Sequence, residues 1–418
     1  MITFVHTADL HLDSPFAGLA DADEDMARFL HSATFQAWDN IVDLCIERSV
    51  DFLLVAGDVY DGADRSLRAQ LAFRDGLERL AEKEIPAFVV HGNHDPLNGW
   101  ASSLSWPDSV HVFGPELESI PFERNGEQQA IIHGVSFPER DVTENLARRF
   151  EADDDSVSQI GLLHCNVGTD TGHEPYAPCS LDDLEEVGMD YWALGHVHTR
   201  RVLSNRRPAA VYPGNPQGRH ANEAGPHGCY FVELDDGHAE MDFVPVDAVR
   251  WVRSAVEIGS LVTEDDLIGA LEDAVSGVSR EVGGRRAVCR LVLRGRGPMH
   301  ATLARSGTLE DLSERLRGLG QSLNPTVWVE KIEDDTRPAV DLEARRESED
   351  VLGDLLRLAD EYRNDPERLE ELRESLDDLY GHRRAGRFLE EPDRQQLLAI
   401  LEQAESLCVD RLLEGEQE

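Results

Sequence analysis

Residues 2–11, Ile-Thr-Phe-Val-His-Thr-Ala-Asp-Leu-His, place an aspartate and a histidine shortly after an apolar run rich in β-branched residues. Four further polar stretches occur along the chain, and most of them also follow an apolar run: Gly57-Asp58-Val-Tyr-Asp61, Gly92-Asn93-His94-Asp95, His164 and Gly195-His196-Val-His198. Short apolar runs separated by helical segments are typical of the buried strands of an α/β protein. Because the carboxyl ends of such strands meet at one edge of a sheet, the five stretches predict a single site.

The expected secondary structure follows from the same pattern. The apolar runs predict buried strands at Ile2–Val5, Phe52–Val55, Phe88–Val90, Ile160–Leu163 and Tyr191–Leu194. Helical segments are expected between them, among others at Asp25–Arg48 and Ser66–Lys83. Beyond residue 198 the pattern changes to strands and turns, and the Asp235-Asp236-Gly237 turn predicts a hairpin.

The polar stretches contain enough ligand-type side chains for two divalent ions. Two ions a few ångströms apart need a bridging carboxylate and a few nitrogen or oxygen ligands on each side. In our interpretation the first ion is chelated by Asp9 and His11, with His198 completing its ligands, and Asp58 is the bridge. The second ion is completed by the remaining three candidates: Asn93, His164 and His196.

His94 is the candidate catalytic residue, because adjacent side chains diverge and it cannot easily share a metal with Asn93. It is free to act as a general acid or as a hydrogen-bond donor to a phosphate. Asp61 lies three residues beyond Asp58 and is expected to orient His94, as carboxylates orient imidazoles in many sites. The other histidines in or beside apolar runs are interpreted as structural or as supporting the ligands: His6, His91 and His133.

Length and composition indicate a globular protein of two or three domains, since 418 residues exceed the usual size of one core. No apolar run is long enough to span a bilayer, and the first residues lead into a strand rather than a signal-peptide pattern. The six cysteines are scattered without a CxxC pair. This usage favours reduced thiols and a cytoplasmic location.

The net charge of −42 is the outlying feature, because 82 acidic residues stand against 40 basic ones, of which only Lys83 and Lys331 are lysines. An acidic, lysine-poor surface keeps a protein soluble in molar salt, where charge repulsion is screened within about 3 Å. We therefore expect a halophilic host; a GC-rich genome would favour arginine but would not explain the excess of acids. Any nucleic acid would be held by local arginines and metal ions.

Three domains are expected along the chain. Residues 1–248 carry all the ligand candidates. Residues 249–335 show a β-α-β-α-β order, with helices opened by Thr263 and Thr308, and carry no ligand cluster. Residues 336–418 have leucines at helical spacing and no strand signal, which predicts helices that either bind a partner or pack on the preceding domain.

The five polar stretches resemble those of the calcineurin-like metallophosphoesterase superfamily over residues 1 to about 248. Longer stretches are similar to its DNA-repair exonuclease branch, the SbcD- and YhaO-like nucleases, and favour the YhaO-like subgroup: His6-Thr-Ala-Asp9-Leu-His11-Leu-Asp13-Ser-Pro-Phe16, Gly172-His-Glu-Pro-Tyr-Ala-Pro-Cys179, Tyr191-Trp-Ala-Leu-Gly-His-Val-His198 and Tyr212-Pro-Gly-Asn-Pro-Gln-Gly-Arg-His220.

This resemblance implies a four-layer α/β/β/α sandwich of two sheets flanked by helices, followed by a smaller α+β capping domain and a helical C-terminal tail. It also implies Mn²⁺-dependent cleavage of DNA phosphodiester bonds, as an exonuclease and sometimes an endonuclease, in double-strand-break repair. Members commonly work with a coiled-coil ABC-type ATPase bound through the C-terminal helices. Their nuclease domains commonly form homodimers.

Two other functions remain open. Several nuclease relatives carry histidine at the position of Asp61, whereas phosphoprotein phosphatases carry an aspartate there, so a phosphatase or cyclic-nucleotide phosphodiesterase is one alternative. The capping domain and tail speak against it, since small-molecule phosphatases of this fold generally lack both. A non-catalytic scaffold is the other alternative, but it would be expected to have a broken ligand set.

Arginines near the ligand motifs are the candidates for DNA contacts. Arg200 and Arg201 directly follow His198, and Arg219 with His220 lies in the Pro-Gly stretch. Guanidinium groups suit phosphodiester oxygens near metals, although ion pairs with the abundant acids are an equal alternative. Residues 13–16, after the first ligand pair, are expected to shape the substrate entrance.

Overall fold

The computed structural model describes residues 1–14, 24–62, 66–99, 104–152, 157–168, 174–380 and 392–415. The chain forms two compact units. Unit 1 comprises Met1–Val256, Ile268–Val292 and Leu309–Glu333, and unit 2 comprises Glu257–Leu267, Leu293–Thr308 and Asp334–Glu418. The three domains expected from the sequence remain a prediction.

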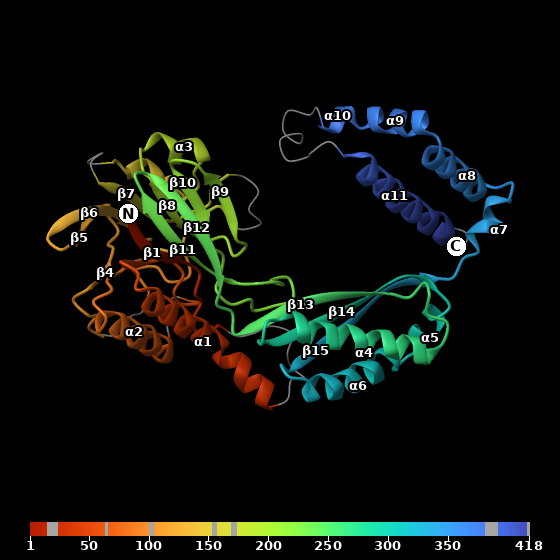
Figure 1. The fold of residues 1–418 in the computed structure, drawn as a ribbon, viewed down its shortest axis with the longest axis horizontal. Coiled ribbons are helices and arrows are strands. Elements are labelled where there is room, and N and C mark those ends of the chain that lie inside the picture. Colours follow the sequence, from red (N-terminus) through yellow and green to blue (C-terminus); the bar gives the residue numbers. More distant parts are fainter. Residues whose placement is uncertain are drawn as a thin grey trace. The chain divides into compact units, whose positions relative to one another are not determined.

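Two six-stranded sheets build the N-terminal part of unit 1 (Figure 1). The strand order of the first sheet is β12 (His238–Pro245), β11 (Gly228–Asp235), β1 (Ile2–Thr7), β2 (Phe52–Ala56), β3 (Ala87–Val90) and β4 (Val110–Val112). The order of the second is β5 (Glu118–Arg124), β6 (Glu127–Val135), β7 (Ser158–His164), β8 (Tyr191–Gly195), β10 (Ala209–Tyr212) and β9 (Arg201–Asn205). The central strands of each sheet run parallel, so their carboxyl ends lie at one edge.

The sheets are covered on both faces, which explains why their central strands are almost wholly apolar. One core lies between the two sheets and includes Phe4, Phe52, Ile160 and Tyr191. The other face of the first sheet packs on α1 (Glu24–Arg48) and α2 (Leu67–Ala81). The other face of the second sheet packs on α3 (Leu181–Glu186) and the 3₁₀-helix η1 (Leu146–Arg149). The expected four-layer α/β/β/α fold is confirmed.

Local sequence signals account for several element boundaries. Ser66 caps α2 by accepting a hydrogen bond from the backbone N–H of Ala69, and Ser180 forms a capping box with Asp183 at the start of α3. The β11–β12 hairpin turns at Asp236 and Gly237, which both have positive φ, as expected for an Asp-Gly turn.

The segment after β12 contains a three-stranded sheet in the order β13 (Val249–Glu257), β14 (Arg286–Gly297), β15 (Val327–Pro338). Its helices are α4 (Glu264–Glu281), the short α5 (His300–Leu303) and α6 (Thr308–Ser322). The observed order contains the β-α-β-α-β order expected from the sequence, with α5 added. Within unit 1, Trp251 of β13 is buried in a cluster with Met26 and Leu30 of α1.

The described residues of unit 2 after β15 form helices joined by short turns and loops, and no strand. The helices are α7 (Leu342–Arg346), α8 (Val351–Asn364), α9 (Pro366–Ser375), α10 (Asp377–Tyr380) and α11 (Arg394–Gly415). Leu352 and Leu356 of α8 pack against Val409 of α11. No helix among the described residues has the length and apolarity needed to cross a membrane.

Candidate metal centre

The candidate ligands occupy the loops at the carboxyl ends of strands in both sheets. Asp9 and His11 follow β1, Asp58 follows β2, and Asn93 follows β3 of the first sheet, whereas His164 ends β7 and His196 and His198 follow β8 of the second. The loops after β1 and β2 continue side by side, because the N–H groups of Asp9 and His11 donate to the carbonyls of Gly57 and Asp58. The fold thus brings all seven predicted ligands to one edge of the sandwich.

The backbone at this edge is strained. Four candidate ligands adopt the positive φ angles that L-residues rarely use: Asp9 at 53°, His11 at 42°, Asp58 at 49° and His196 at 107°. Each such residue costs on the order of 1–3 kcal/mol and persists only where the surrounding structure enforces it. Strain of this kind gathers at functional sites.

Two glycines allow the loops to approach closely. A Cβ added to Gly195 would lie 1.8 Å from the carbonyl oxygen of Ala56, and one added to Gly92 would lie 2.4 Å from Oδ1 of Asp58. Both distances are far below any real contact. The glycines of the Gly-Asn-His-Asp and Gly-His-x-His stretches are therefore required for the ligand loops to pack.

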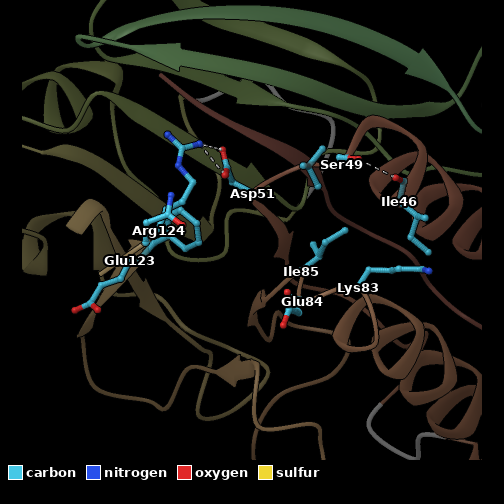
Figure 2. A pocket seen from close by; sticks show the side chains of 11 residues that line it. Ile46, Ser49, Asp51, Lys83, Glu84, Ile85, Glu123 and Arg124 are labelled. Carbon is cyan, nitrogen blue, oxygen red and sulfur yellow. Dashed lines mark hydrogen bonds and ion pairs between the residues drawn. The ribbon is translucent and has the colours of Figure 1, made fainter. Parts of the chain in front are cut away.

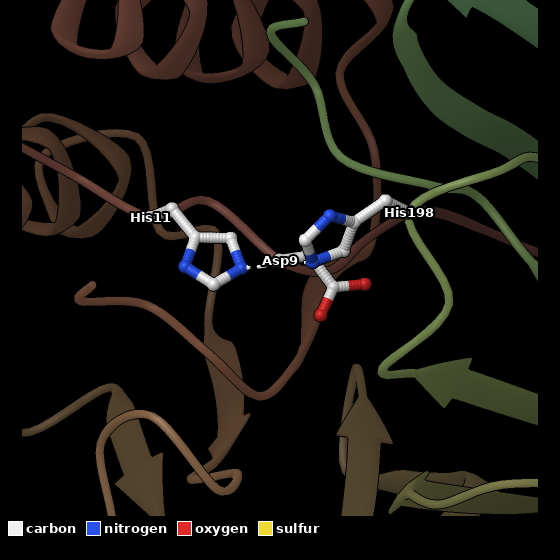
Figure 3. A group of neighbouring side chains, drawn as sticks. All are labelled: Asp9, His11 and His198. Atoms are coloured by element: carbon white, nitrogen blue, oxygen red, sulfur yellow. Dashed lines mark hydrogen bonds between the residues drawn. The ribbon is translucent and has the colours of Figure 1, made fainter. Parts of the chain in front are cut away.

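One group of ligand atoms forms around Asp9, His11 and His198 (Figure 3). Their ligand atoms lie within 4.8 Å of one another. The Nε2 atoms of the two histidines face each other at 3.1 Å, and both carboxylate oxygens of Asp9 accept from the N–H of His196. Asp9 and His11 are fully buried.

The second group surrounds Asp58, which is buried between the two groups. Its Oδ2 lies 3.5 Å from Nε2 of His164 and 3.9 Å from Nε2 of His11, so it is placed to serve both. Oδ1 of Asn93 is 3.0 Å from Nε2 of His164 and 3.2 Å from Nδ1 of His196. The position of Asp58 allows the bridging role expected from the sequence, which stays a prediction.

Three of the histidines have their outer ring nitrogen fixed by an acceptor. Nδ1 of His164 lies 2.9 Å from the carbonyl oxygen of Ala56, and Nε2 of His196 lies 2.8 Å from that of Glu174. Nδ1 of His198 lies 3.0 Å from Oε1 of Glu223. Because a carbonyl or carboxylate can only accept, the outer nitrogen carries the proton and the inner nitrogen keeps its lone pair. Metal-binding histidines are oriented in this way.

The charges of the centre suit divalent cations. Burial, followed by the charge of Asp58, raises the pKa of Asp9 well above its ordinary value. Burial and the charge of Asp95 raise the pKa of Asp58 to about 7. Burial lowers the pKa of His164 to about 4, so that this ring is neutral. Bound cations would offset the repulsion between the converging carboxylates, and the neutral imidazoles can donate their lone pairs to them. The mixed oxygen and nitrogen donors fit Mn²⁺ among others.

His94 lies beside the ligands but is fixed differently. The backbone N–H of His94 donates to Oδ1 of Asp58, and its ring Nδ1 is 3.2 Å from the backbone carbonyl oxygen of Asp61. The Asp61 carboxylate, which we expected to orient His94, instead lies 3.0 Å from Nη1 of Arg219 and 3.0 Å from Nδ1 of His11. Only the first of these two contacts has hydrogen-bond geometry. Asp61 thus holds His94 through its main chain.

Two further acids stabilise the centre and were not singled out in the sequence. Fully buried Asp95 accepts from the N–H groups of Gly92 and Val59, and its Oδ2 lies 2.9 Å from Nδ1 of His91, so it joins the loops after β2 and β3. Glu223 accepts from the N–H of Arg219 in addition to its contact with His198. The fourth position of the Gly-Asn-His-Asp stretch marked Asp95, whereas no local pattern marks Glu223.

The candidate DNA-contacting residues lie at different distances from the ligands. Arg219 donates to Ser14 and Asp61, and its Nη2 is 3.3 Å from Nδ1 of His198. Nε2 of His220 is 3.5 Å from the Glu223 carboxylate. The guanidinium of Arg200 instead stacks 4.1 Å from the ring of Phe243 on β12.

Parts of the sequence motifs fall outside the described residues. Asp13 accepts a hydrogen bond from Ser66 at the start of α2. The remainder of the expected substrate entrance, which includes Phe16, lies outside the described residues, as do Gly172 and the histidine after it. The entrance stays a prediction.

A pocket of about 460 Å³ lies at the amino ends of β2 and β3, the edge opposite to the candidate ligands (Figure 2). It is lined by Lys83, Glu84 and Phe122, among others, and by the ion pair of Arg124 with Asp51. No histidine lines it. The chemistry of the chain is therefore concentrated at the other edge, among the buried ligands.

Comparisons with known proteins agree with this geometry. The calcineurin-like phosphoesterase family matches residues 2–200, and the middle domain of metallophosphoesterase YhaO matches residues 251–337. An uncharacterised metallophosphoesterase YhaO from Bacillus subtilis is 38% identical over 342 residues, which are 82% of this chain and 83% of that protein. The DNA double-strand break repair protein Mre11 of Thermoplasma acidophilum is 24% identical, over 59% of this chain and 66% of its own. A component of the B. subtilis nuclease SbcCD is 23% identical, over 53% of this chain and 63% of its own.

Proposed function

The chain belongs to the calcineurin-like metallophosphoesterases, in their YhaO-like branch, and on this basis we propose that it is a DNA nuclease that hydrolyses phosphodiester bonds with two divalent metal ions. It acts as an exonuclease or endonuclease, with Mn²⁺ as the metal, in the repair of double-strand breaks. The relatives named as a repair protein and as part of a nuclease support this choice of substrate.

The observation that carries the proposal is the complete set of seven buried or half-buried ligand candidates at one edge of the sandwich. Asp9, His11, Asp58 and His198 would hold one ion. Asp58, Asn93, His164 and His196 would hold the other. A scaffold without catalytic activity would not need the strained backbone and the fixed histidine rings that accompany this set.

Metal ions bound there would supply a strong nucleophile at neutral pH and stabilise negative charge on the phosphate oxygens. The protein's own part is to hold the phosphodiester in line and to deliver a proton. Arg219, whose fork lies between Asp61 and His198, is placed to position a phosphate oxygen. The ligand side chains are mostly buried, and the lower effective dielectric constant around them strengthens these electrostatic interactions.

His94 is the candidate donor of a proton to the leaving oxygen. Its Nδ1 is held by the Asp61 carbonyl oxygen, so the proton given to the leaving oxygen would come from Nε2 of the doubly protonated ring, which then keeps the proton on Nδ1. General acid catalysis of this kind contributes on the order of 10²–10⁴ in rate. A carboxylate oxygen of Asp61 lies within 4.8 Å of a ring nitrogen of His94, but the hydrogen-bond acceptor of His94 is the Asp61 carbonyl oxygen, and the carboxylate pairs with Arg219, so the aspartate–histidine pair typical of phosphoprotein phosphatases is not formed.

The remaining features complete the proposal. α8 and α11 carry exposed apolar side chains such as Leu358 and Leu407, which suit a coiled-coil ABC-type ATPase as the partner. A homodimer, a cytoplasmic location and a salt-accumulating host are part of the same proposal. The acidic composition supports the last of these.

The test is cleavage of end-labelled linear DNA by the purified protein with Mn²⁺ in molar KCl. We expect shortening that His94→Ala abolishes and that His238→Ala, which changes an exposed histidine of β12, preserves. Hydrolysis of bis-p-nitrophenyl phosphate without DNA cleavage would refute DNA as the substrate while keeping the metal chemistry. Inactivity on both substrates, with no bound metal, would instead support a scaffold.

A further inference from the structure

We propose that the exposed edge of β9 binds the backbone of the nucleic-acid strand that extends away from the metal centre, with Arg201 and Arg206 as the phosphate contacts. This inference rests on the proposed nuclease function and adds a substrate path to it. β9 begins three residues after the ligand His198 and is the last strand of the second sheet, so among the described residues only one of its edges is paired.

The register of β9 fixes the direction of this path. β9 runs antiparallel to β10, with Arg201 opposite Tyr212 and Asn205 opposite Ala209. Tyr212 donates to the carbonyl of Cys165, the residue after the ligand His164, so this end of β9 lies beside the centre. Ala209 pairs with Tyr191 at the start of β8, so the other end of β9 lies at the amino ends of the parallel strands, away from the candidate ligands.

The length of β9 suits a strand of nucleic acid. Arg206 directly follows the end of β9, and the pairing of β9 with β10 contains one register shift, so the five steps from Arg201 to Arg206 cover at most about 17 Å at roughly 3.3 Å per residue. A stacked strand carries one phosphate per roughly 3.4 Å of its axis, so the two arginines are at most about five nucleotides apart. Arg201 would contact the strand close to the scissile bond, and Arg206 would contact it further along.

The charges point to an anionic ligand. Both arginines are exposed, and neither has an ion pair with any described residue, although acidic side chains outnumber basic ones by 82 to 40. The next residue, Arg207, shows the usual arrangement: its Nε is 2.6 Å from Oδ1 of Asp190. Two guanidinium groups without an acidic partner among the described residues are therefore available to phosphates, which they match as hydrogen-bonding forks.

A structural role is the competing explanation, because charged side chains on an edge strand also prevent it from pairing with another strand. Such a role makes no difference to DNA affinity. It predicts that removing the charges changes the association of the protein with itself.

The experiment measures binding of a fluorescein-labelled 20-nucleotide single-stranded DNA to the full chain in EDTA, by anisotropy across a salt series. We compare Arg201→Ala/Arg206→Ala with Arg148→Ala/Arg315→Ala, which removes the same charge from arginines paired with Asp183 and Glu272. The β9 variant should bind about tenfold more weakly, with a slope of log K against log salt shallower by about 1.4 for two lost contacts. The control should stay within about twofold of the parent.

The outcomes separate this inference from the proposed function. Parent-like affinity and salt slope in the β9 variant would overturn the DNA path, even if the protein cleaves DNA. Self-association of that variant in size-exclusion chromatography, with DNA binding unchanged, would likewise overturn it in favour of edge protection. A specific loss of binding in a protein that does not cleave DNA would keep the path and refute the nuclease.

Discussion

Glu223→Gln should weaken metal binding without removing any ligand. The Glu223 carboxylate lies 3.0 Å from Nδ1 of His198, and it also accepts from the N–H of Arg219. Burial raises the pKa of Glu223, but the hydrogen bond with His198 and the charge of Arg219 outweigh it and hold the pKa well below its ordinary value. The group is therefore a carboxylate at every working pH.

The size of the effect follows from the role of this contact. A carboxylate that accepts the outer proton of a metal-binding histidine raises the basicity of the inner nitrogen, and losing it typically costs 10–100-fold in metal affinity. That range corresponds to about 1.4–2.8 kcal/mol. Glutamine can still accept from His198 through a carbonyl oxygen at the Oε1 position, but its amide group would then take the place of Oε2 and face the backbone N–H of Arg219, so that two donors would oppose each other. We expect the upper half of the range.

Titration calorimetry of the metal-free protein with Mn²⁺ measures the affinity directly. Glu185→Gln, an exposed change on α3, is the matched control and should bind as the parent does. Only the ion held by His198 should be affected, so one of two binding steps should weaken. If Glu223→Gln folds normally and both steps keep the parental affinity, the assignment of His198 as a ligand oriented by Glu223 is wrong.

Three further predictions concern the centre and its loops. His94→Ala should lower kcat on a dinucleotide by about 10²–10⁴, and by less on bis-p-nitrophenyl phosphate, whose leaving group needs no proton; an equal loss on both would contradict the acid role. In EDTA the raised pKa of Asp58, about 7, means that the folded protein keeps a proton which the unfolded chain loses near pH 4, so stability should fall by a few kcal/mol as pH rises through this window. The free energy of unfolding in urea is measured against pH for the parent and for Asp58→Asn, and the difference between the two curves gives the contribution of Asp58. Buried histidines such as His6, whose pKa is lowered to about 3, change the stability in the opposite direction but do so equally in both proteins. Parallel curves would refute the prediction. Gly195→Ala should lower Tm strongly or prevent folding, whereas Gly269→Ala on α4, where a Cβ meets nothing within 4 Å, should leave Tm unchanged or raise it.

The sequence was informative wherever a strand was buried on both faces. Continuous apolar runs predicted β1, β2, β3, β7 and β8 to within about two residues at each end. The positions of the candidate ligands in the fold then followed, because each of them lies at or shortly after the end of such a run. The turn between β11 and β12 was also predicted from local sequence, because Asp-Gly between two strand-like runs is a hairpin signal.

Strands with mixed or exposed composition gave no such signal. β5 contains Pro121 and alternates only weakly, and β4 has three half-buried residues, so the run from Val110 to Val135 was not resolved from sequence into β4, β5 and β6. β9 was missed because its exposed arginine and asparagine resemble a loop. In each case pairing with a neighbouring strand, rather than local preference, determines the structure.

Contacts between side chains that are distant in sequence were also beyond prediction. We expected Asp61 to orient His94, which is 33 residues away, yet its carboxylate accepts a hydrogen bond from Arg219, which is 158 residues away. Glu223 reaches His198 from a loop with no recognisable pattern. These contacts depend on how the loops of both sheets meet, which the sequence of any one loop does not encode.

Because the candidate ligands are divided between the two sheets, the resistance of this protein to proteolysis should depend on the concentration of the metal in the cell. Each proposed ion takes ligands from both halves of the sandwich, so the ions bind only when the halves are together. Binding at a hundredfold excess over Kd adds about 2.7 kcal/mol to stability, which lowers the population of opened molecules about a hundredfold. Because proteases cut opened molecules, a cell starved of the metal would degrade the enzyme as well as inactivate it. Its abundance would then report the metal status of the cell.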